Sequence, residues 1–134
     1  MKSECTQTTR NKKIVFQENK SKLTIVNKDE VLCDKITVDG CEITEGKRCD
    51  FLLLIKQSEC YVELKGQDVN KAIEQIETTI KKLSVNSQKH KKRSYIIGTR
   101  IPLSSETIQN LKIQFRKKYN STLIVKSTPY EDTI

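Results

Sequence analysis

The sequence contains no long apolar run. Its longest spans Phe51 to Ile55, whereas a helix that crosses a membrane needs about 20 consecutive apolar residues. The first twenty residues are polar and basic, and they lack the step from a charged head into an apolar stretch that marks a secretory signal peptide. These two absences predict a soluble, intracellular protein of the cytoplasm.

Histidine is scarce, and the cysteines lack the spacing of a zinc site. His90 is the single histidine, and no CxxC pair occurs, although structural zinc sites usually combine closely spaced cysteine or histidine pairs. An odd number of cysteines without a signal peptide also argues against the disulfide framework of a secreted protein. We expect free thiols packed on or near strands, with a redox-labile pair between strands as the alternative. The five cysteines are Cys5, Cys33, Cys41, Cys49 and Cys60.

Positive charge is in excess in this chain of 134 residues. Twenty-five Lys and Arg against seventeen Asp and Glu give a net charge of +8 and a pI near 9.3, which suits a partner rich in phosphate. A chain of this length fits one domain, and no internal repeat or low-complexity tract divides it. We therefore expect a single domain over residues 13–134, preceded by a polar, disordered tail over residues 1–12.

The first half of the chain is dominated by short apolar segments. Those between Ile14 and Val38 are separated by charged or amide residues, which favours short strands over a helix. The turn dipeptide Asp39-Gly40 predicts a hairpin between the segments ITV and CEIT. The run CDFLLLI, which ends at Ile55, is typical of a strand buried on both faces. A loop over 56–59 and a second strand, CYVELK, follow.

The second half of the chain changes to a helical period. From Asp68 to Leu83 the apolar residues step by three or four, and Asp68 can cap the helix. The strand SYIIGTRI, a second helix capped by Ser104 or Ser105 and a last strand, STLIVKS, complete the order. This order predicts an α/β domain with a central mixed β-sheet and two main helices, in which the strand, helix, strand units are parallel.

Charged residues stand at the ends of the two central apolar segments. Asp50 precedes FLLLI, and Glu63 and Lys65 close CYVELK. Residues two apart share one face of a strand, so Glu63 and Lys65 point one way while Leu64 points into the opposite layer. An even-numbered loop over 56–59 sets Asp50 opposite Lys65, with all three charged groups on one face. Two carboxylates about 7 Å apart along the backbones can share a hard divalent cation such as magnesium.

This segment is similar to the PD-(D/E)XK nuclease superfamily, which includes type II restriction endonucleases and archaeal Holliday-junction resolvases. The similarity covers about residues 41–100: Asp50, then Glu63-Leu64-Lys65 on the next strand, then an amphipathic helix. It implies a restriction-endonuclease-like fold and an endonuclease that hydrolyses DNA. It also implies that Asp50 and Glu63 bind Mg²⁺ or Mn²⁺, with the backbone carbonyl of Leu64 as an extra ligand, and that Lys65 assists the attacking water.

The resemblance extends to a residue of the helix and meets two departures. Gln75 resembles a glutamine that some members place near the active site. Cys49 stands where members often have proline. Members also usually begin with a helix that carries another metal-binding acid, and no amphipathic helix precedes Asp50 in this sequence. Glu18 and Glu30 are the acidic residues that could take that part.

A basic stretch without acidic residues covers positions 81–93. Such blocks usually form a solvated surface, but beside a nuclease centre a basic loop can hold the phosphate backbone without reading the base sequence. One small domain holds one centre and cutting both strands takes two, so we expect a homodimer. We expect its substrate to be DNA rather than RNA. The candidate nucleic-acid contacts are Lys89, Lys91, Lys92, Arg93 and Arg100.

Two other classes of function stay open. The chain could be a nuclease-like protein that no longer cuts and instead binds nucleic acid or regulates another protein. It could also be an interaction protein or inhibitor that holds an acidic partner on its basic face. The endonuclease and the inactive nuclease-like protein should both bind nucleic acid of arbitrary sequence in a salt-sensitive way, whereas the interaction protein should not.

Overall fold

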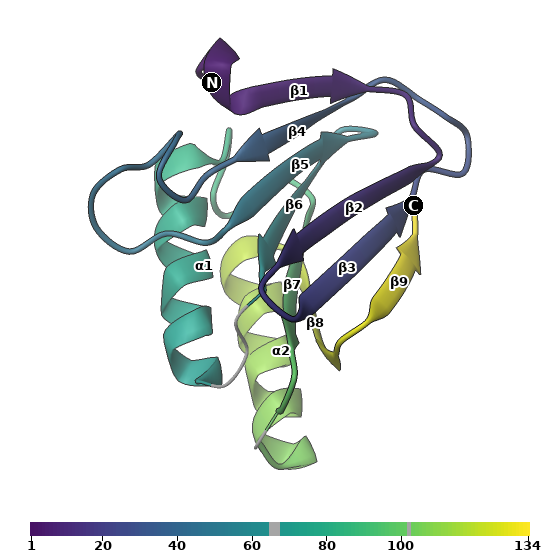
Figure 1. The fold of residues 1–134 in the computed structure, drawn as a ribbon. Helices are drawn as coiled ribbons and strands as arrows, with labels where there is room; N and C mark the ends of the chain where they lie inside the picture. Colours follow the sequence, from purple (N-terminus) through teal and green to yellow (C-terminus); the bar gives the residue numbers. More distant parts are fainter. Residues whose placement is uncertain (65–67, 102) are drawn as a thin grey trace.

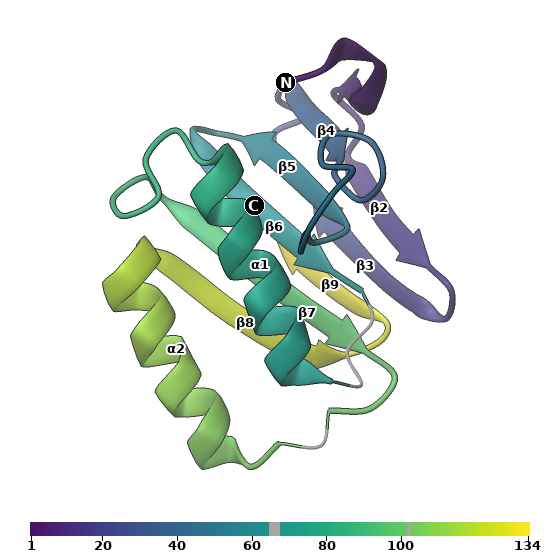
Figure 2. The ribbon, with the colours of Figure 1, turned by 90° about the vertical axis from the view of Figure 1, so that its left-hand side faces the viewer.

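The computed structural model describes residues 1–64, 68–101 and 103–134, and these form three layers (Figure 1). A six-stranded sheet lies in the middle, with two helices on one face and a three-stranded sheet on the other (Figures 1 and 2). This arrangement confirms the predicted α/β class with a mixed sheet and two helices. The elements of the described residues are η1 (Ser3–Cys5), β1 (Thr6–Thr9), β2 (Lys13–Glu18), β3 (Ser21–Val26), β4 (Cys33–Thr37), β5 (Phe51–Ile55), β6 (Ser58–Glu63), α1 (Val69–Leu83), β7 (Lys92–Gly98), α2 (Ser105–Tyr119), β8 (Ser121–Ser127) and β9 (Tyr130–Thr133).

The six-stranded sheet has the order β1-β4-β5-β6-β7-β8. Strands β1, β4, β5 and β6 pair antiparallel, whereas β7 is parallel to β6 and β8 is parallel to β7. The parallel pairs are those predicted from the strand, helix, strand order, because α1 and α2 each return the chain to the same end of the sheet. Among the described residues, no helix is long and apolar enough to cross a membrane.

The central sheet is buried on both faces, which explains the unbroken apolar run of β5. Leu52 packs on the helix side, whereas Leu53 and Ile55 pack against the three-stranded sheet. Successive strand residues point to opposite faces, so a strand between two cores is apolar at every position. Tyr61 and Cys60 of β6 divide between the two cores in the same way.

Both helices begin at the residues predicted to cap them. The Asp68 side chain accepts a hydrogen bond from the Lys71 N–H at 3.1 Å, and the Ser104 hydroxyl accepts one from the Thr107 N–H at 3.2 Å. Such caps satisfy amide groups that have no partner within the helix. Helix α1 buries its apolar stripe under the sheet, whereas the buried residues of α2 are confined to its last two turns, at Phe115 and Tyr119.

The hairpin between β5 and β6 differs from its prediction in length and register. Its turn consists of Lys56 and Gln57 alone, both with positive φ (49° and 58°), as in the two-residue turns that match strand twist. The expected loop over 56–59 was two residues too long. Phe51 pairs with Val62, so Asp50, one residue further along, lies across from Glu63. The predicted pairing of Asp50 with position 65 is therefore wrong.

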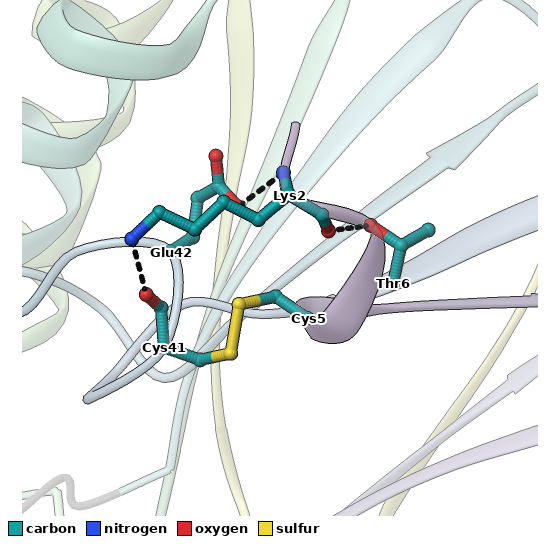
Figure 3. Close-up of a disulfide and its surroundings, with 5 residues drawn as sticks. All are labelled: Lys2, Cys5, Thr6, Cys41 and Glu42. Carbon is teal, nitrogen blue, oxygen red and sulfur yellow. Dashed lines mark hydrogen bonds between the residues drawn. A yellow bond between two sulfur atoms is a disulfide. The ribbon is translucent and has the colours of Figure 1, made fainter.

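The segment that was predicted to be a disordered tail is instead ordered. Strand β1 pairs antiparallel with β4 at the edge of the six-stranded sheet, and Cys5 forms a disulfide with Cys41 (Figure 3). The Lys2 N–H donates to the Glu42 carboxylate at 2.9 Å, and Lys2 Nζ donates to the Cys41 carbonyl at 3.1 Å (Figure 3). The amino terminus is thus fastened to the turn that follows β4. The disulfide lies outside the regular strands, unlike the redox-labile pair considered above.

Two further sequence expectations fail near the ends of strands. The hairpin predicted between ITV and CEIT does not form, because β4 pairs with β1 and β5, and CEIT contributes only an isolated bridge between Asp39 and Ile43. Gly40 does occupy a turn with positive φ, as the dipeptide predicted. Strand β9, which the sequence did not reveal, runs parallel to β3, and its Asp132 accepts a hydrogen bond from the Tyr95 hydroxyl at 2.7 Å.

The double variant Cys5→Ser/Cys41→Ser should lose stability. The disulfide joins residues 36 apart, and opening a loop of that length should lower the free energy of unfolding by about 4 kcal/mol. Urea unfolding of the oxidised wild type and the variant measures the difference. Dithiothreitol should destabilise the wild type by the same amount and leave the variant unchanged. Equal unfolding free energies would show that the cross-link contributes no stability.

Candidate metal and phosphate site

Three carboxylates from different parts of the chain meet at one place. One oxygen from each of Glu18, Asp39 and Asp50 lies within 4.8 Å of the other two. Glu18 is the last residue of β2, Asp39 follows β4, and Asp50 immediately precedes β5. The three-stranded sheet therefore contributes one acid and the six-stranded sheet the other two. We call these three residues the acid group.

Backbone hydrogen bonds fix two members of the acid group to each other and to β6. The Leu64 N–H donates to Asp50 Oδ2 at 2.8 Å, and the Asp50 N–H donates to the Val62 carbonyl at 3.0 Å. The Asp39 N–H donates to the Asp50 carbonyl at 3.2 Å. Asp50 is only 3% exposed, so its carboxylate has little freedom to turn away from the group.

Two other residues of the predicted centre, Glu63 and Leu64, lie beside Asp50. Glu63 is 1% exposed and lies across from Asp50, but it is not one of the three clustered acids. The Leu64 side chain packs into the core between the two sheets, which agrees with the prediction that it points into the opposite layer. Lys65 lies outside the described residues, and its role stays a prediction. Of the two alternative acids, the structure brings Glu18 to the site, and Glu30 is not a member of the group.

A cleft of about 340 Å³ opens next to the acid group. Asp39 lines it together with Gln75 of α1, so the structure brings the predicted glutamine to the site. Arg48 Nε donates to Asp39 Oδ1 at 2.8 Å and remains partly exposed. The acid group and the basic residues of the cleft are therefore adjacent, because Asp39 belongs to the acid group and also lines the cleft. The described lining residues are Asp39, Gly46, Lys47, Arg48, Lys71 and Gln75, and we call this the basic cleft.

The cysteine that precedes Asp50 has a structural role. The Cys49 N–H donates to the Thr79 hydroxyl of α1 at 2.8 Å, which ties the start of β5 to the helix. Burial and the nearby carboxylates of Glu63 and Asp50 raise the pKa of the Cys49 thiol to about 12. The thiol therefore stays protonated at neutral pH, and chemistry based on a cysteine nucleophile is disfavoured.

The basic stretch over 81–93 lies at the other end of β6. The Glu59 N–H donates to the Lys91 carbonyl at 3.0 Å, and at about 3.3 Å per residue Glu59 is roughly 13 Å along the strand from Glu63. Lys89 and Lys91 are exposed there, far from the acid group. Arg100 is exposed and follows the end of β7 that lies beside Glu63.

Two residues predicted to contact nucleic acid bind within the protein instead. Lys92 is 1% exposed, and its Nζ donates to the carbonyls of Asn86, His90 and Tyr119 at 2.8, 2.6 and 2.9 Å. Burial lowers the pKa of Lys92. Lys92 therefore holds the loop after α1 and the end of α2, in place of the predicted phosphate contact. Arg93 pairs with Asp132 of β9 at 3.1 Å.

The sequence missed most of the basic cleft. Asp39 had been assigned to a turn, and Lys47, Arg48 and Lys71 carried no motif. Local pattern could not reveal them, because the β4–β5 connection and α1 are separate in sequence and come together only in the tertiary fold. Arg48 stands two residues before Asp50, and this proximity in sequence was the one signal that could have linked a basic residue of the cleft to the predicted centre.

Comparison with known proteins gives no match to this chain, whether with family models, with curated proteins or with solved structures. The function is therefore inferred from the residues of the site and their arrangement.

Substitution of Lys92 should reveal its structural role. Lys92→Met removes three hydrogen bonds and leaves the buried Tyr119 carbonyl without this donor, so it should lower the free energy of unfolding by about 3 kcal/mol. The matched control, Lys91→Met, removes the same charge from an exposed neighbour and should change stability by less than about 0.5 kcal/mol. Urea unfolding of both variants is the measurement. Equal stability of the two variants would contradict the role assigned to Lys92.

Proposed function

We propose that this protein is a metal-dependent endonuclease that hydrolyses DNA, related in its centre to the PD-(D/E)XK enzymes. One observation carries the proposal: Asp39 belongs both to the acid group and to the basic cleft. The shared residue supports a site for a divalent cation next to a site for phosphate. Phosphodiester hydrolysis assisted by a metal requires this combination.

The acid group suits a hard divalent cation. Three carboxylates within 4.8 Å of one another repel each other when ionised, and a cation bound by oxygen ligands relieves that repulsion. Mg²⁺ and Mn²⁺ prefer such ligands and keep waters in the remaining positions. The geometry favours Glu18, Asp39 and Asp50 as the ligands, whereas the sequence resemblance implies Asp50, Glu63 and the Leu64 carbonyl. Asp50 is common to both sets.

The basic cleft suits the phosphate backbone. Lys47, Arg48 and Lys71 line it within one cavity, and phosphate contacts of this kind supply affinity without reading sequence. Arg48 also holds Asp39, so it can orient a metal ligand and face a phosphate at once. Lys47 pairs with Glu74 of α1, and both side chains of that pair remain exposed enough to separate when a phosphate approaches.

The division of chemical roles follows from this placement. A bound Mg²⁺ would neutralise charge on the scissile phosphate and lower the pKa of a water. Asp50, held by the Leu64 N–H, keeps a ligand oxygen in place. The resemblance assigns Lys65 to the attacking water, and Gln75 lies in the cleft wall where it can hydrogen-bond the substrate. Cutting both strands of a duplex would require two such centres, as in a homodimer.

Metal binding should depend on the acid group. Mn²⁺ should raise the Tm of the wild type by binding the folded state, and Asp50→Asn should weaken Mn²⁺ binding on the order of tenfold by removing ligand charge. Thermal unfolding across a Mn²⁺ titration measures both. Glu30→Gln, a substitution of an exposed acid outside the group, is the matched control and should behave as wild type.

The same titration separates the two ligand sets. Weaker Mn²⁺ binding in Glu18→Gln, with Glu63→Gln unchanged, is the result expected from the geometry. The reverse result would assign the metal to Glu63 and the Leu64 carbonyl. No Tm shift in the wild type at millimolar Mn²⁺ would contradict the metal site altogether.

Cleavage should require the metal and the predicted centre. We expect the wild type to cut plasmid, single-stranded or branched DNA in Mg²⁺ or Mn²⁺ and not in EDTA, with RNA as the comparison substrate. Asp50→Asn, which changes the ligand common to both sets, should lower the rate on the order of 100-fold or more, and Glu63→Ala should do so if Glu63 is a ligand as the resemblance implies. Metal binding without cleavage of any of these substrates would favour the nuclease-like protein that binds nucleic acid and no longer cuts.

Phosphate binding should map to the basic cleft. Lys71→Met should weaken binding to duplex DNA in EDTA and reduce the slope of log affinity against log salt by about 0.9, the value for one lost phosphate contact. Lys81→Met removes an exposed charge from the same helix outside the cleft and should leave the slope unchanged. Fluorescence anisotropy over a salt series is the measurement. Equal slopes for both variants would exclude the cleft as the contact, and absence of salt-sensitive binding would favour the interaction protein.

A further inference from the structure

A second groove, with a different set of lining residues, lies along the free edge of the six-stranded sheet. Strand β8 is the last strand of that sheet, and α2 runs beside its outer edge (Figure 2). Residues of both elements line a cavity of about 470 Å³. Tyr130, at the start of β9, contributes to its lining from the three-stranded sheet. None of the residues assigned above to the metal and phosphate site lines this groove.

The backbone of β8 has an open edge. Within the described residues it pairs along its length with β7 alone, so alternate N–H and C=O groups point away from the sheet. Proteins usually shorten, bend or cover such edges because they attract other strands. The opposite edge follows this pattern, since β1 is only four residues long. Strand β8 has seven residues and carries consecutive apolar side chains at Leu123, Ile124 and Val125.

The lining of the groove is apolar at its centre. Leu123 is buried, and Ile124 is half-buried. Ile113 projects from α2 with 52% of its surface exposed. A strand laid along β8 would direct alternate side chains toward α2 and toward Tyr130, and would cover Ile113. The shape and the open backbone therefore fit an extended peptide.

The charge of the groove identifies the kind of peptide. Four basic side chains line it, and the described lining residues include no aspartate or glutamate. The four are Lys112, Arg116, Lys117 and Lys126.

We propose that an extended, acidic segment of a partner protein binds here as an additional strand beside β8. The backbone edge supplies hydrogen bonds. Side chains on the α2 side of the added strand meet Ile113 and three of the cations, whereas those on the other side meet Tyr130 and Lys126, so each side takes both aliphatic and acidic residues. A second copy of this chain would set the basic lining against itself. A nucleic acid would engage the cations but leave the strand edge and the apolar lining without partners.

The probe is a fluorescent peptide in which pairs of valine alternate with pairs of glutamate, so that each side of the added strand carries both residue types. It is long enough to span the seven residues of β8. Fluorescence anisotropy should show saturable binding that weakens with salt, and no binding by the matching valine and lysine peptide. N-methylation removes hydrogen-bond donors from one edge of a strand at a time. Methylation of one alternate set of residues should abolish binding, and methylation of the other set should preserve it. Equal loss with both sets would contradict strand addition.

Two charge-matched variants locate the peptide on the protein. Lys112→Glu/Lys117→Glu should weaken binding at least about tenfold. Lys81→Glu/Lys118→Glu changes the net charge equally at exposed positions outside the groove and should bind as wild type. Equal weakening in both would show a general charge effect and overturn the proposal. Circular dichroism confirms that each variant is folded.

Two other occupants give different results. A single-stranded oligonucleotide that displaces the peptide and binds more tightly would make the groove a nucleic-acid site and overturn the proposal. A concentration-dependent dimer in sedimentation that the peptide dissociates would make the occupant a second copy. Saturable peptide binding by a monomer, with no competition from the oligonucleotide, is the expected result. The metal titration and cleavage assays are independent of this outcome, because they involve different residues.

Discussion

The antiparallel pairing of β5 with β6 across a two-residue turn fixes Asp50, the residue around which the rest of the candidate site is arranged. Because Phe51 pairs with Val62, Asp50 comes across from Glu63 and receives the Leu64 N–H. A register shifted by two residues would move Asp50 away from that donor. The pairing of β4 with β5 then places Asp39 within hydrogen-bonding distance of the Asp50 backbone. Two of the three clustered acids therefore depend on a single hairpin and its neighbouring strand.

The basic cleft depends on a different contact, between the β4–β5 connection and α1. The hydrogen bond from the Cys49 N–H to the Thr79 hydroxyl joins them, and Lys71 and Gln75 lie on the same helix. The connection supplies Lys47 and Arg48 without regular secondary structure of its own. Function often resides in such loops because a rigid scaffold positions them while their sequence remains unconstrained by packing.

Local pattern sufficed where one element determined its own structure. The helix after Asp68 and the strand STLIVKS have strong periodicity or bounded apolar runs, and both formed as predicted. The turn at Lys56 and Gln57 contains neither glycine nor asparagine, so no local signal disclosed its length. The strand at residues 6–9 is polar and gains its order from β4 and from the disulfide rather than from its own sequence.

The candidate site was predictable only in part: Asp50, Glu63 and Gln75 were named from the sequence, and Glu18 was one of two alternative acids. Asp50 and Glu63 stand out because charge interrupts apolar strands, whereas Asp39 and Glu18 are ordinary polar residues until the tertiary fold brings them together. In the basic stretch over 81–93, the sequence likewise could not show which lysines are buried and which are exposed. Nothing local distinguishes Lys92, which is buried against three carbonyls, from Lys91, which is exposed.

The position of the disulfide has a topological consequence for the acid group. The bond between Cys5 and Cys41 closes a covalent ring, and both Glu18 and Asp39 belong to the chain inside that ring. Ring closure limits how far apart two enclosed residues can move, which raises their effective concentration toward each other even where the surrounding structure loosens. The covalent bond thus lowers part of the entropy cost of bringing Glu18 and Asp39 together. This effect does not depend on a bound cation or on the packing between the two sheets.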